Sequence, residues 1–149
     1  MDVILGDARL SMEREPSQQF DLLVLDAFSG DAIPVHLVTL EAFRLYRRHL
    51  SPNGVLAIHI TNKHLDLTPV VARGAEAPQA QSVLIEHDGN GKEIFNVDSD
   101  WILVTGNPKV LEQAEIVRTG RILPGRYQNA PVWTDSFSNL WQVLQWGRG

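Results

Sequence analysis

The order and character of the apolar segments predict an α/β fold with a mainly parallel β-sheet and helices on both of its faces. Residues 20–26 and 55–60 are almost uninterrupted apolar runs, which are typical of strands buried on both faces of a parallel sheet. Segments with helical spacing alternate with these runs along the chain. Residues 81–86 and 101–105 also have strand character but leave no room for a long helix between them, so we expect an antiparallel pair at the C-terminal edge.

Turn and capping residues divide the first half of the chain into elements. Asp7 can cap a brief helix, which Pro16 ends. Thr39 can cap a longer helix with apolar residues at helical spacing, and the Ser-Pro-Asn-Gly sequence of residues 51–54 ends it. The expected elements are a strand at 3–5, a helix at 8–14, a strand at 20–26 and a helix at 40–50.

The second half is divided in the same way. Thr68 followed by Pro69 marks the start of a short helix, and Asn107 precedes a proline that opens another. Asp135 can cap a last helix, in which apolar residues recur at i, i+3, i+4 and i+7, namely Phe137, Leu140, Trp141 and Leu144. The expected elements are strands at 55–60, 81–86 and 101–105 and helices from 70, 108 and 135. Core or interface roles are expected for Trp133, Trp141 and Trp146.

Length and composition restrict the possible functions. The chain has 149 residues, the usual size of one domain. It carries 13 Lys and Arg against 18 Asp and Glu and contains no basic run, so no nucleic-acid partner is expected. The absence of cysteine excludes disulfides, thiolate metal sites and cysteine nucleophiles. No apolar run approaches the ~20 residues of a membrane span, and no signal-peptide pattern is present, so we expect a cytoplasmic protein without a membrane partner.

Three carboxylates lie at predicted strand ends or just beyond them. Ligands of open α/β sheets bind outside the carboxyl ends of the strands, which makes Asp7, Asp26 and Asp31 candidates for chemistry. Asp7 has the alternative role of a helix cap, and Asp31 that of a turn residue. An acid at position 26, at the end of a buried strand, is less easily explained by packing.

The other polar residues form no catalytic motif. His59 and His64 are five residues apart and lack the H-E-x-x-H spacing of a zinc helix, so we expect structural or solvated histidines and no metal site. Ser29 has glycine on one side only, so the G-x-S-x-G elbow of a hydrolase is missing.

Several segments, taken in order, resemble the second half of spermidine synthase-like proteins, the polyamine aminopropyltransferase family. These segments are Gly-Asp-Ala-Arg at 6–9, Phe-Asp-Leu-Leu-Val-Leu-Asp-Ala-Phe at 20–28 and Leu-Ser-Pro-Asn-Gly-Val-Leu at 50–56. Residues 31–34 with 40–43, and residues 133–135 with 138–140, are similar to a branch of that family often described as spermidine synthase-like or fused to a transporter. The resemblance implies a partial Rossmann-like domain, a three-layer sandwich of the class I methyltransferase fold.

The resemblance also implies roles for the acids. Asp7, with Ala8, would bind the nucleoside of decarboxylated S-adenosylmethionine or S-adenosylmethionine, Asp7 accepting a hydrogen bond from the adenine amino group. Asp26 would deprotonate and orient the attacking amine. A polyamine nitrogen has a pKa of about 10 and arrives protonated, so a carboxylate that takes the proton has a chemical purpose. Asp31 would contact the substrate, a polyamine or another small amine.

Two departures from the family pattern affect these expectations. The family's second aspartate comes three residues after the catalytic one, whereas Asp31 comes five residues after Asp26. The chain contains no G-x-G-x-x-G, so residues 1–149 are predicted to form a single partial domain without the glycine-rich nucleotide-binding strands. An apolar strand edge would then lack its partner. We expect residues 3–5 to move beside the 20–25 strand, or two chains to join as a homodimer or oligomer through that edge or the last helix.

Three functions follow from these observations. The first is a spermidine synthase-like transferase that lacks full activity in this form. The second is a non-catalytic α/β module that forms oligomers. The third is methyl transfer to an unknown small molecule, which remains open because the fold is shared.

Overall fold

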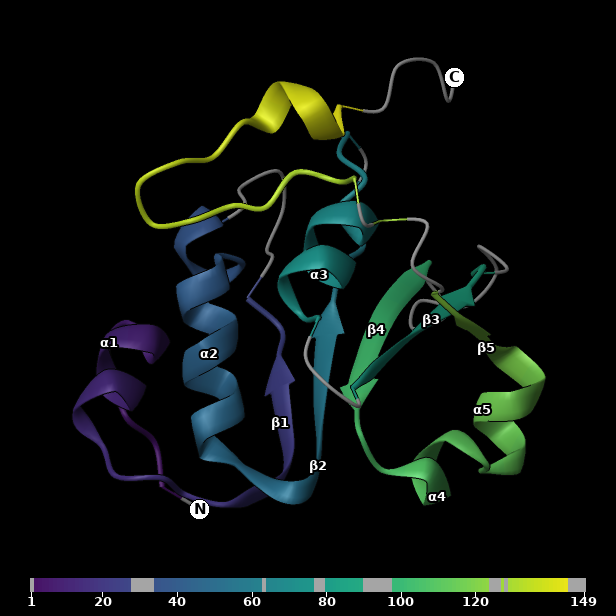
Figure 1. The fold of residues 1–149 in the computed structure, drawn as a ribbon, viewed down its shortest axis with the longest axis horizontal. Helices are drawn as coiled ribbons and strands as arrows, with labels where there is room; N and C mark the ends of the chain where they lie inside the picture. Colours follow the sequence, from purple (N-terminus) through teal and green to yellow (C-terminus); the bar gives the residue numbers. More distant parts are fainter. Residues whose placement is uncertain are drawn as a thin grey trace.

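The computed structural model describes residues 2–27, 34–62, 64–76, 80–89, 98–123, 127 and 129–144. They form one five-stranded sheet with helices packed against it (Figure 1). The strand order is β1-β2-β4-β3-β5, with bounds Phe20–Leu25 (β1), Leu50–His59 (β2), Gln81–His87 (β3), Ser99–Thr105 (β4) and Gly120–Ile122 (β5).

The directions of the strands confirm the predicted antiparallel pair. β1 and β2 are parallel, and β4 lies between β2 and β3 and is antiparallel to both. β1, β2 and β3 therefore all point the same way and end at one edge of the sheet. β5, which the sequence did not indicate, adds an antiparallel strand beside β3.

Asp7 and Thr39 cap the first two α-helices with their side chains, as predicted. Asp7 Oδ1 accepts a hydrogen bond from the Leu10 amide at 2.9 Å, and Thr39 Oγ1 accepts one from the Ala42 amide at 3.3 Å. The third predicted helix differs: it begins at Thr68, whose amide donates to the Asp66 carboxylate at 3.0 Å, so Thr68 is not its cap. The helices are α1 Ala8–Arg14, α2 Leu40–His49, α3 Thr68–Gly74, α4 Pro108–Leu111, α5 Ala114–Thr119 and the 3-10 turns η1 Val35–Leu37 and η3 Leu140–Val143.

The core lies between α2, α3 and one face of the sheet. The strand register places alternate apolar residues on this face, and they join the buried side chains of α2 and α3 in one cluster. Phe43 and Tyr46 of α2 meet edge to face at 6.0 Å. The sheet contributes Leu25, Leu56, Ile58, Leu84, Ile102 and Val104.

The opposite face of the sheet is covered only in part. A Cβ at Gly120 would meet both Val83 and Ile116, so α5 packs on this face beside β3 and β5. At β1 the same face is open: Leu22 and Val24 are 58% and 50% exposed. The prediction that this strand is buried on both faces is therefore wrong, because among the described residues no helix packs over its second face.

The N-terminal segment is also not as expected. Residues 3–5 form no strand, and Val3, Ile4 and Leu5 are 70%, 65% and 92% exposed. The outer edge of β1 has no partner strand within the described part of the chain. The expectation that residues 3–5 move beside β1 is thus wrong, while the association of two chains stays a prediction.

The last predicted helix is replaced by an extended segment with one 3-10 turn. Asn139, not Asp135, caps that turn, its side chain accepting from the Trp141 amide at 3.1 Å. Trp133 is a core residue, 1% exposed, whereas Trp141 is 74% exposed. Trp146 lies outside the described residues.

Arg9 holds this C-terminal segment against α1 and α2. Its guanidinium donates to both carboxylate oxygens of Asp135, at 2.7 and 2.5 Å, and to Glu13 at 3.0 Å. It also donates to the His36 carbonyl at 2.7 Å and to Thr39 Oγ1 at 3.2 Å. Asp135 is therefore an ion-pair partner and not a helix cap.

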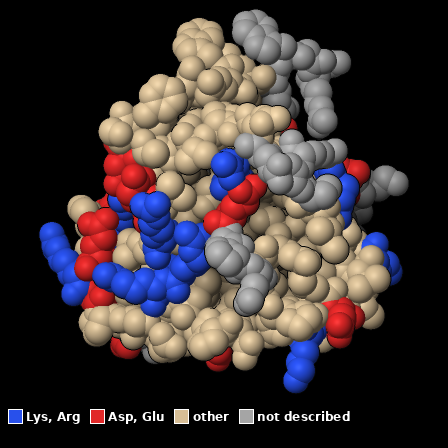
Figure 2. Space-filling view, in the orientation of Figure 1, with Lys and Arg blue, Asp and Glu red and all other residues tan. Residues whose placement is uncertain are grey.

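Basic and acidic side chains are mixed on the face seen in Figure 2. The arginines at the end of α2 bond to backbone carbonyls of other elements, Arg47 to Ala75 and Arg48 to Met12. These cations therefore hold elements together. Within the described residues, none of the helices combines the length and apolar character needed to cross a membrane.

Candidate functional site

Asp26 and His59 meet at the edge of the sheet where the parallel strands end. Leu25 pairs with Ile58 at the end of the β1–β2 ladder; Asp26 follows Leu25 just beyond β1, and His59 follows Ile58 as the last residue of β2. Because successive side chains alternate between the faces, both project away from the face that Leu25 and Ile58 bury. The His59 Nδ1 atom lies 2.8 Å from Asp26 Oδ1. The sequence interpretation of His59 as merely structural or solvated thus missed a contact with the predicted catalytic acid.

Two further contacts fix the His59 ring. Its Nε2 atom lies 2.8 Å from Thr61 Oγ1, and the ring stacks on Trp101 of β4 with centroids 4.8 Å apart and planes at 24°. The Trp101 indole donates to Ser99 Oγ at 2.7 Å, which fixes the indole in turn. The His59 side chain is 21% exposed and that of Asp26 is 59% exposed. The half-exposed Asp26 carboxylate is therefore hydrogen-bonded to a histidine ring that is itself fixed in position.

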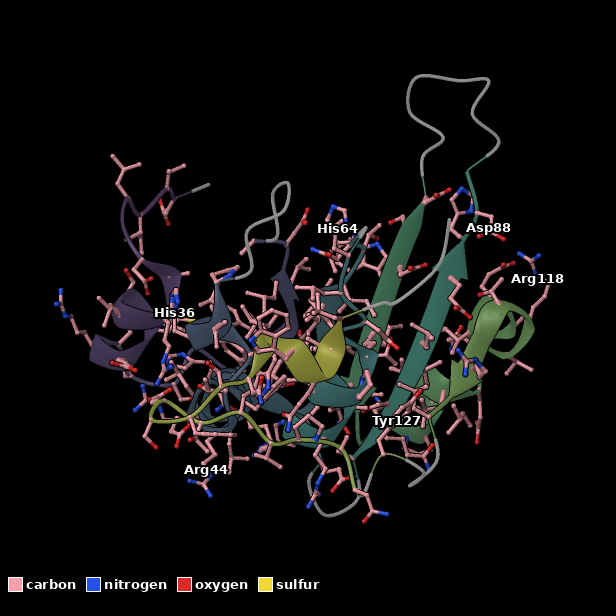
Figure 3. The ribbon with its side chains drawn as sticks, turned by 90° about the horizontal axis from the view of Figure 1, so that it is seen from above. His36, Arg44, His64, Asp88, Arg118 and Tyr127 are labelled. Atoms are coloured by element: carbon pink, nitrogen blue, oxygen red, sulfur yellow. The ribbon has the colours of Figure 1, made fainter. Side chains whose placement is uncertain are left out.

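Acidic residues of β3 and β4 border this pair. The Asp100 amide donates to Thr61 Oγ1 at 2.7 Å, which connects the start of β4 to the His59 contact. Burial raises the pKa of the Asp100 carboxyl, and the nearby charges of Glu86, Asp88 and Asp98 raise it further. Acidic side chains therefore gather at this end of the sheet, where Asp88 is labelled in Figure 3.

Asp7 belongs to a second group of polar residues beside α1. Besides its cap bond, its Oδ2 atom contacts His36 Nε2 at 2.8 Å. The hydrogen bond from the Leu10 amide is the main cause that lowers the pKa of Asp7, and His36 adds to it. Asp7, His36, Arg9 and Asp135 border a cavity of about 490 Å³. In Figure 3, His36 lies beside α1, away from His64, which follows β2.

The structure thus separates residues that the sequence grouped together. Asp7 caps α1, and Ala8 is the first residue of that helix. Within the described residues, no hydrogen bond or ion pair joins the Asp7 group to Asp26 and His59. Asp31 lies outside the described residues.

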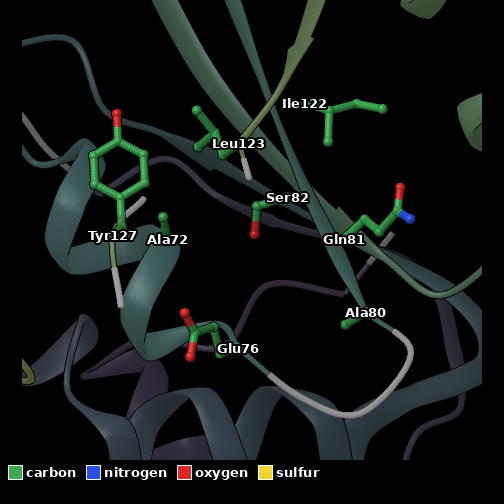
Figure 4. A pocket seen from close by; sticks show the side chains of 8 residues that line it. All are labelled: Ala72, Glu76, Ala80, Gln81, Ser82, Ile122, Leu123 and Tyr127. Carbon is green, nitrogen blue, oxygen red and sulfur yellow. The ribbon is translucent and has the colours of Figure 1, made fainter. Parts of the chain in front are cut away.

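A further cavity of about 260 Å³ lies at the opposite end of the sheet, where β3 begins (Figure 4). It opens beside Gln81 and Ser82, with Glu76 and Tyr127 on its other sides. Its position away from the carboxyl ends of β1 and β2 separates it from Asp26. Neither this cavity nor the Asp26 region brings together three metal-ligating side chains among the described residues.

No protein-family model matches the chain. A polyamine aminopropyltransferase of Vibrio vulnificus (strain CMCP6) is 43% identical over 53 residues, which are 34% of this chain and 18% of that protein. A crystal structure of a probable spermidine synthase from Corynebacterium glutamicum ATCC 13032 superimposes with a TM-score of 0.55 at 17% identity over 92% of this chain. The chain has a spermidine synthase-like fold.

A second solved structure agrees. Spermidine synthase from Thermotoga maritima gives a TM-score of 0.52 at 12% identity over 91% of this chain. The resemblance stated from the sequence and the class I methyltransferase-like fold are therefore confirmed. The chain spans 55% and 44% of the lengths of these two structures and matches 18% of the curated relative. The two solved structures, at 17% and 12% identity, show the fold of this chain.

Proposed function

We propose that this spermidine synthase-like chain carries the amine side of an aminopropyl-transfer site, with Asp26 as the base. The observation that carries this proposal is the placement of a half-exposed carboxylate just beyond a parallel strand, held by His59. The matched polyamine aminopropyltransferase supports the reaction class. The acids around Asp100 favour an acceptor that is a polyamine or another small cationic amine.

In this reaction Asp26 takes one proton from the amine and orients the amine nitrogen. The protonated amine gives a proton to the carboxylate, and its nitrogen lone pair then attacks the carbon next to the sulfonium of decarboxylated S-adenosylmethionine. A carbon–nitrogen bond forms, the carbon–sulfur bond breaks, and its electron pair stays on sulfur in methylthioadenosine. Holding the cation beside the carboxylate also orients the nitrogen for this attack.

The donor side is less complete in these residues. Both carboxylate oxygens of Asp7 already accept a bond, from the Leu10 amide and from His36. Each oxygen has two lone pairs, so Asp7 can accept one more hydrogen bond from an adenine amino group, next to Ala8. The sequence contains no glycine-rich phosphate- or nucleoside-binding turn to add to it. We therefore propose that residues 1–149 alone bind the donor weakly and lack full activity.

Calorimetry and product analysis test both parts. We expect methylthioadenosine to bind the isolated chain with a Kd weaker than about 100 μM, and tighter binding would contradict an incomplete donor site. The Asp7→Ala variant should reduce whatever binding remains. Incubation with decarboxylated S-adenosylmethionine and putrescine should give an aminopropyl product that disappears in Asp26→Asn. A methylated amine formed from S-adenosylmethionine would instead favour methyl transfer.

A second function, self-association, is favoured by the open side of β1. The strand has a free edge within the described chain, and its outward face carries exposed Leu22 and Val24. A free edge next to an apolar face favours pairing with another strand. We propose a homodimer or oligomer through this edge. The route through a C-terminal helix is not retained because the described residues up to 144 form a 3-10 turn there and no α-helix.

Sedimentation equilibrium tests this association. The mass measured for the unmodified chain should exceed the 16.7 kDa of the monomer, and Leu22→Lys should lower it toward that value. Val117→Lys is the matched control, because Val117 is 66% exposed on α5, away from β1. A monomer at high concentration would leave the edge unpaired and contradict the proposal.

A cytoplasmic location stays a prediction.

A further inference from the structure

We propose that His59 is a positioning residue for Asp26, which it holds through an Nδ1–H hydrogen bond so that the second carboxylate oxygen receives the substrate amine. The inference rests on the proposed role of Asp26 as the base. The sequence motifs gave His59 no role in the reaction. Its support is geometric: one imidazole ring meets groups from the ends of β1, β2 and β4.

The hydrogen-bond network determines which ring nitrogen carries the proton. An ionised carboxylate can only accept, so Nδ1 of His59 must donate to Asp26 across the 2.8 Å contact. Thr61 Oγ1 accepts from the Asp100 amide and still has its own proton to give. In a neutral ring, Nε2 therefore accepts from the Thr61 hydroxyl at 2.8 Å. In a protonated ring, Nε2 donates to the second lone pair of that oxygen. Nδ1 donates to Asp26 in both charge states.

The ring is also held against rotation. Stacking on Trp101 sets its plane, and the bond from Trp101 to Ser99 fixes the indole beneath it. With both ring nitrogens and one face engaged, the ring has one orientation. Asp26 by contrast is a short side chain that is 59% exposed, and a carboxylate in that setting samples several rotamers unless a neighbour holds it. His59 is the neighbour that does so.

The two carboxylate oxygens of Asp26 therefore differ in their freedom to bind a substrate amine. Oδ1 of Asp26 is occupied by His59, and Oδ2 has no hydrogen-bond partner among the residues that the structure describes. A cationic nitrogen would meet Oδ2, in an orientation set by the His59 bond. Loss of that bond should weaken amine binding between about tenfold and a hundredfold, the effect of losing one charge-assisted bond or of misplacing a catalytic group.

The test combines a tautomer measurement with amine titration. Long-range ¹H–¹⁵N spectra of histidine-labelled protein should show His59 as the Nδ1–H form when neutral, and Asp26→Ala should convert it to the Nε2–H form common for free imidazole. Spermidine binding, followed by calorimetry, should weaken in His59→Leu. His59→Gln restores a side-chain N–H and should recover most of the affinity. His87→Gln, at an exposed histidine of β3, is the control and should bind as the unmodified chain does.

The outcomes separate the inference from the function on which it rests. Equal spermidine affinity in His59→Leu and the unmodified chain would overturn the positioning role. A neutral Nε2–H form in the unmodified chain would also overturn it. If the unmodified chain fails to bind spermidine, the proposed amine site fails. The spectra then still decide whether His59 holds Asp26, since they require no ligand. Circular dichroism of each variant shows that it is folded.

Discussion

Replacing Arg9 with methionine tests whether one cation ties the C-terminal segment to the rest of the domain. Methionine keeps the apolar stem but removes every donor of the guanidinium. Those donors contact Asp135, Glu13, the His36 carbonyl and Thr39 Oγ1, and the Arg9 side chain is only 11% exposed. The change should therefore destabilise the fold and release residues 134–137 from α1.

The size of the effect follows from the exposure of each partner. Asp135 and Glu13 are 46% and 44% exposed, so water replaces most of what their carboxylates lose. Thr39 is 1% exposed and is not rehydrated so easily. Bonds to charged groups contribute about 1.5–3 kcal/mol each before such compensation, so we expect a total loss of about 2–3 kcal/mol. With a urea m-value near 2 kcal/mol per molar, the unfolding midpoint should fall by roughly 1 M.

The pH dependence of this loss provides a second, independent check. The hydrogen bond from Arg9 is the main cause that lowers the pKa of Asp135, so the folded chain binds this proton less readily than the unfolded chain. Such a group stabilises the fold above its unfolded pKa, and the stabilisation disappears as the pH falls through the lower, folded pKa. The difference between the unmodified chain and Arg9→Met should therefore be full at pH 7 and shrink below about pH 4.

The control is Arg118→Met, which removes an arginine from an ion pair with Glu115 on α5 that is largely exposed. Exposed pairs of this kind contribute about 0–1 kcal/mol, so its midpoint should hardly move. The reasoning is refuted if Arg9→Met costs no more than Arg118→Met. A loss that is the same at pH 7 and at about pH 2, below the range in which Asp135 takes up its proton, would show that packing, and not the Asp135 ion pair, is what Arg9 contributes.

Three other changes probe the core and the border of the site. Gly74→Ala should destabilise by about 1–3 kcal/mol in urea unfolding, because the new Cβ would lie 2.5 Å from the Phe43 ring; an unchanged midpoint would contradict that packing. Burial raises the pKa of Tyr46, whose hydroxyl donates to the Leu37 carbonyl at 2.9 Å. In an ultraviolet titration this tyrosine should therefore ionise at a higher pH than a free tyrosine, and Tyr46→Phe should remove that high-pH step. Asp100→Asn should stabilise the fold at pH 7, since a raised folded pKa costs stability as the pH rises, and the gain should vanish in acid.

Features that depend on a few neighbouring residues could be predicted from the sequence. Asp7, Thr39 and Asn107 cap helices because a cap needs only its own side chain and an amide two or three residues on. The antiparallel pair of β3 and β4 was also foreseen, because the segment between them is too short for a crossover helix. The resemblance to spermidine synthase-like proteins rests on such local segments as well.

Features that depend on distant partners could not be predicted. β1 has the composition of a buried strand, but burial is decided by what packs above it, and Leu22 and Val24 remain exposed. Asp135 has the position of a helix cap, yet Arg9, 126 residues earlier, takes its carboxylate. The apolar spacing after it favours a helix, but the chain there forms a 3-10 turn and buries Val143, whose carbonyl accepts from the Asp66 amide at 2.8 Å. In each case a tertiary contact overrides a local preference.

The Asp26–His59 pair shows how register converts distant residues into a site. These residues are 33 positions apart, and neither alone indicates a pair. They meet because β1 and β2 align Leu25 with Ile58, after an irregularity near Phe20. A Cβ at Gly54 would lie 2.7 Å from the Phe20 carbonyl oxygen, so the close approach of the strands there requires glycine. A slip of one residue would turn His59 to the opposite face, away from Asp26. The glycine of the turn motif thus contributes to the site by setting the register that brings His59 to the acid.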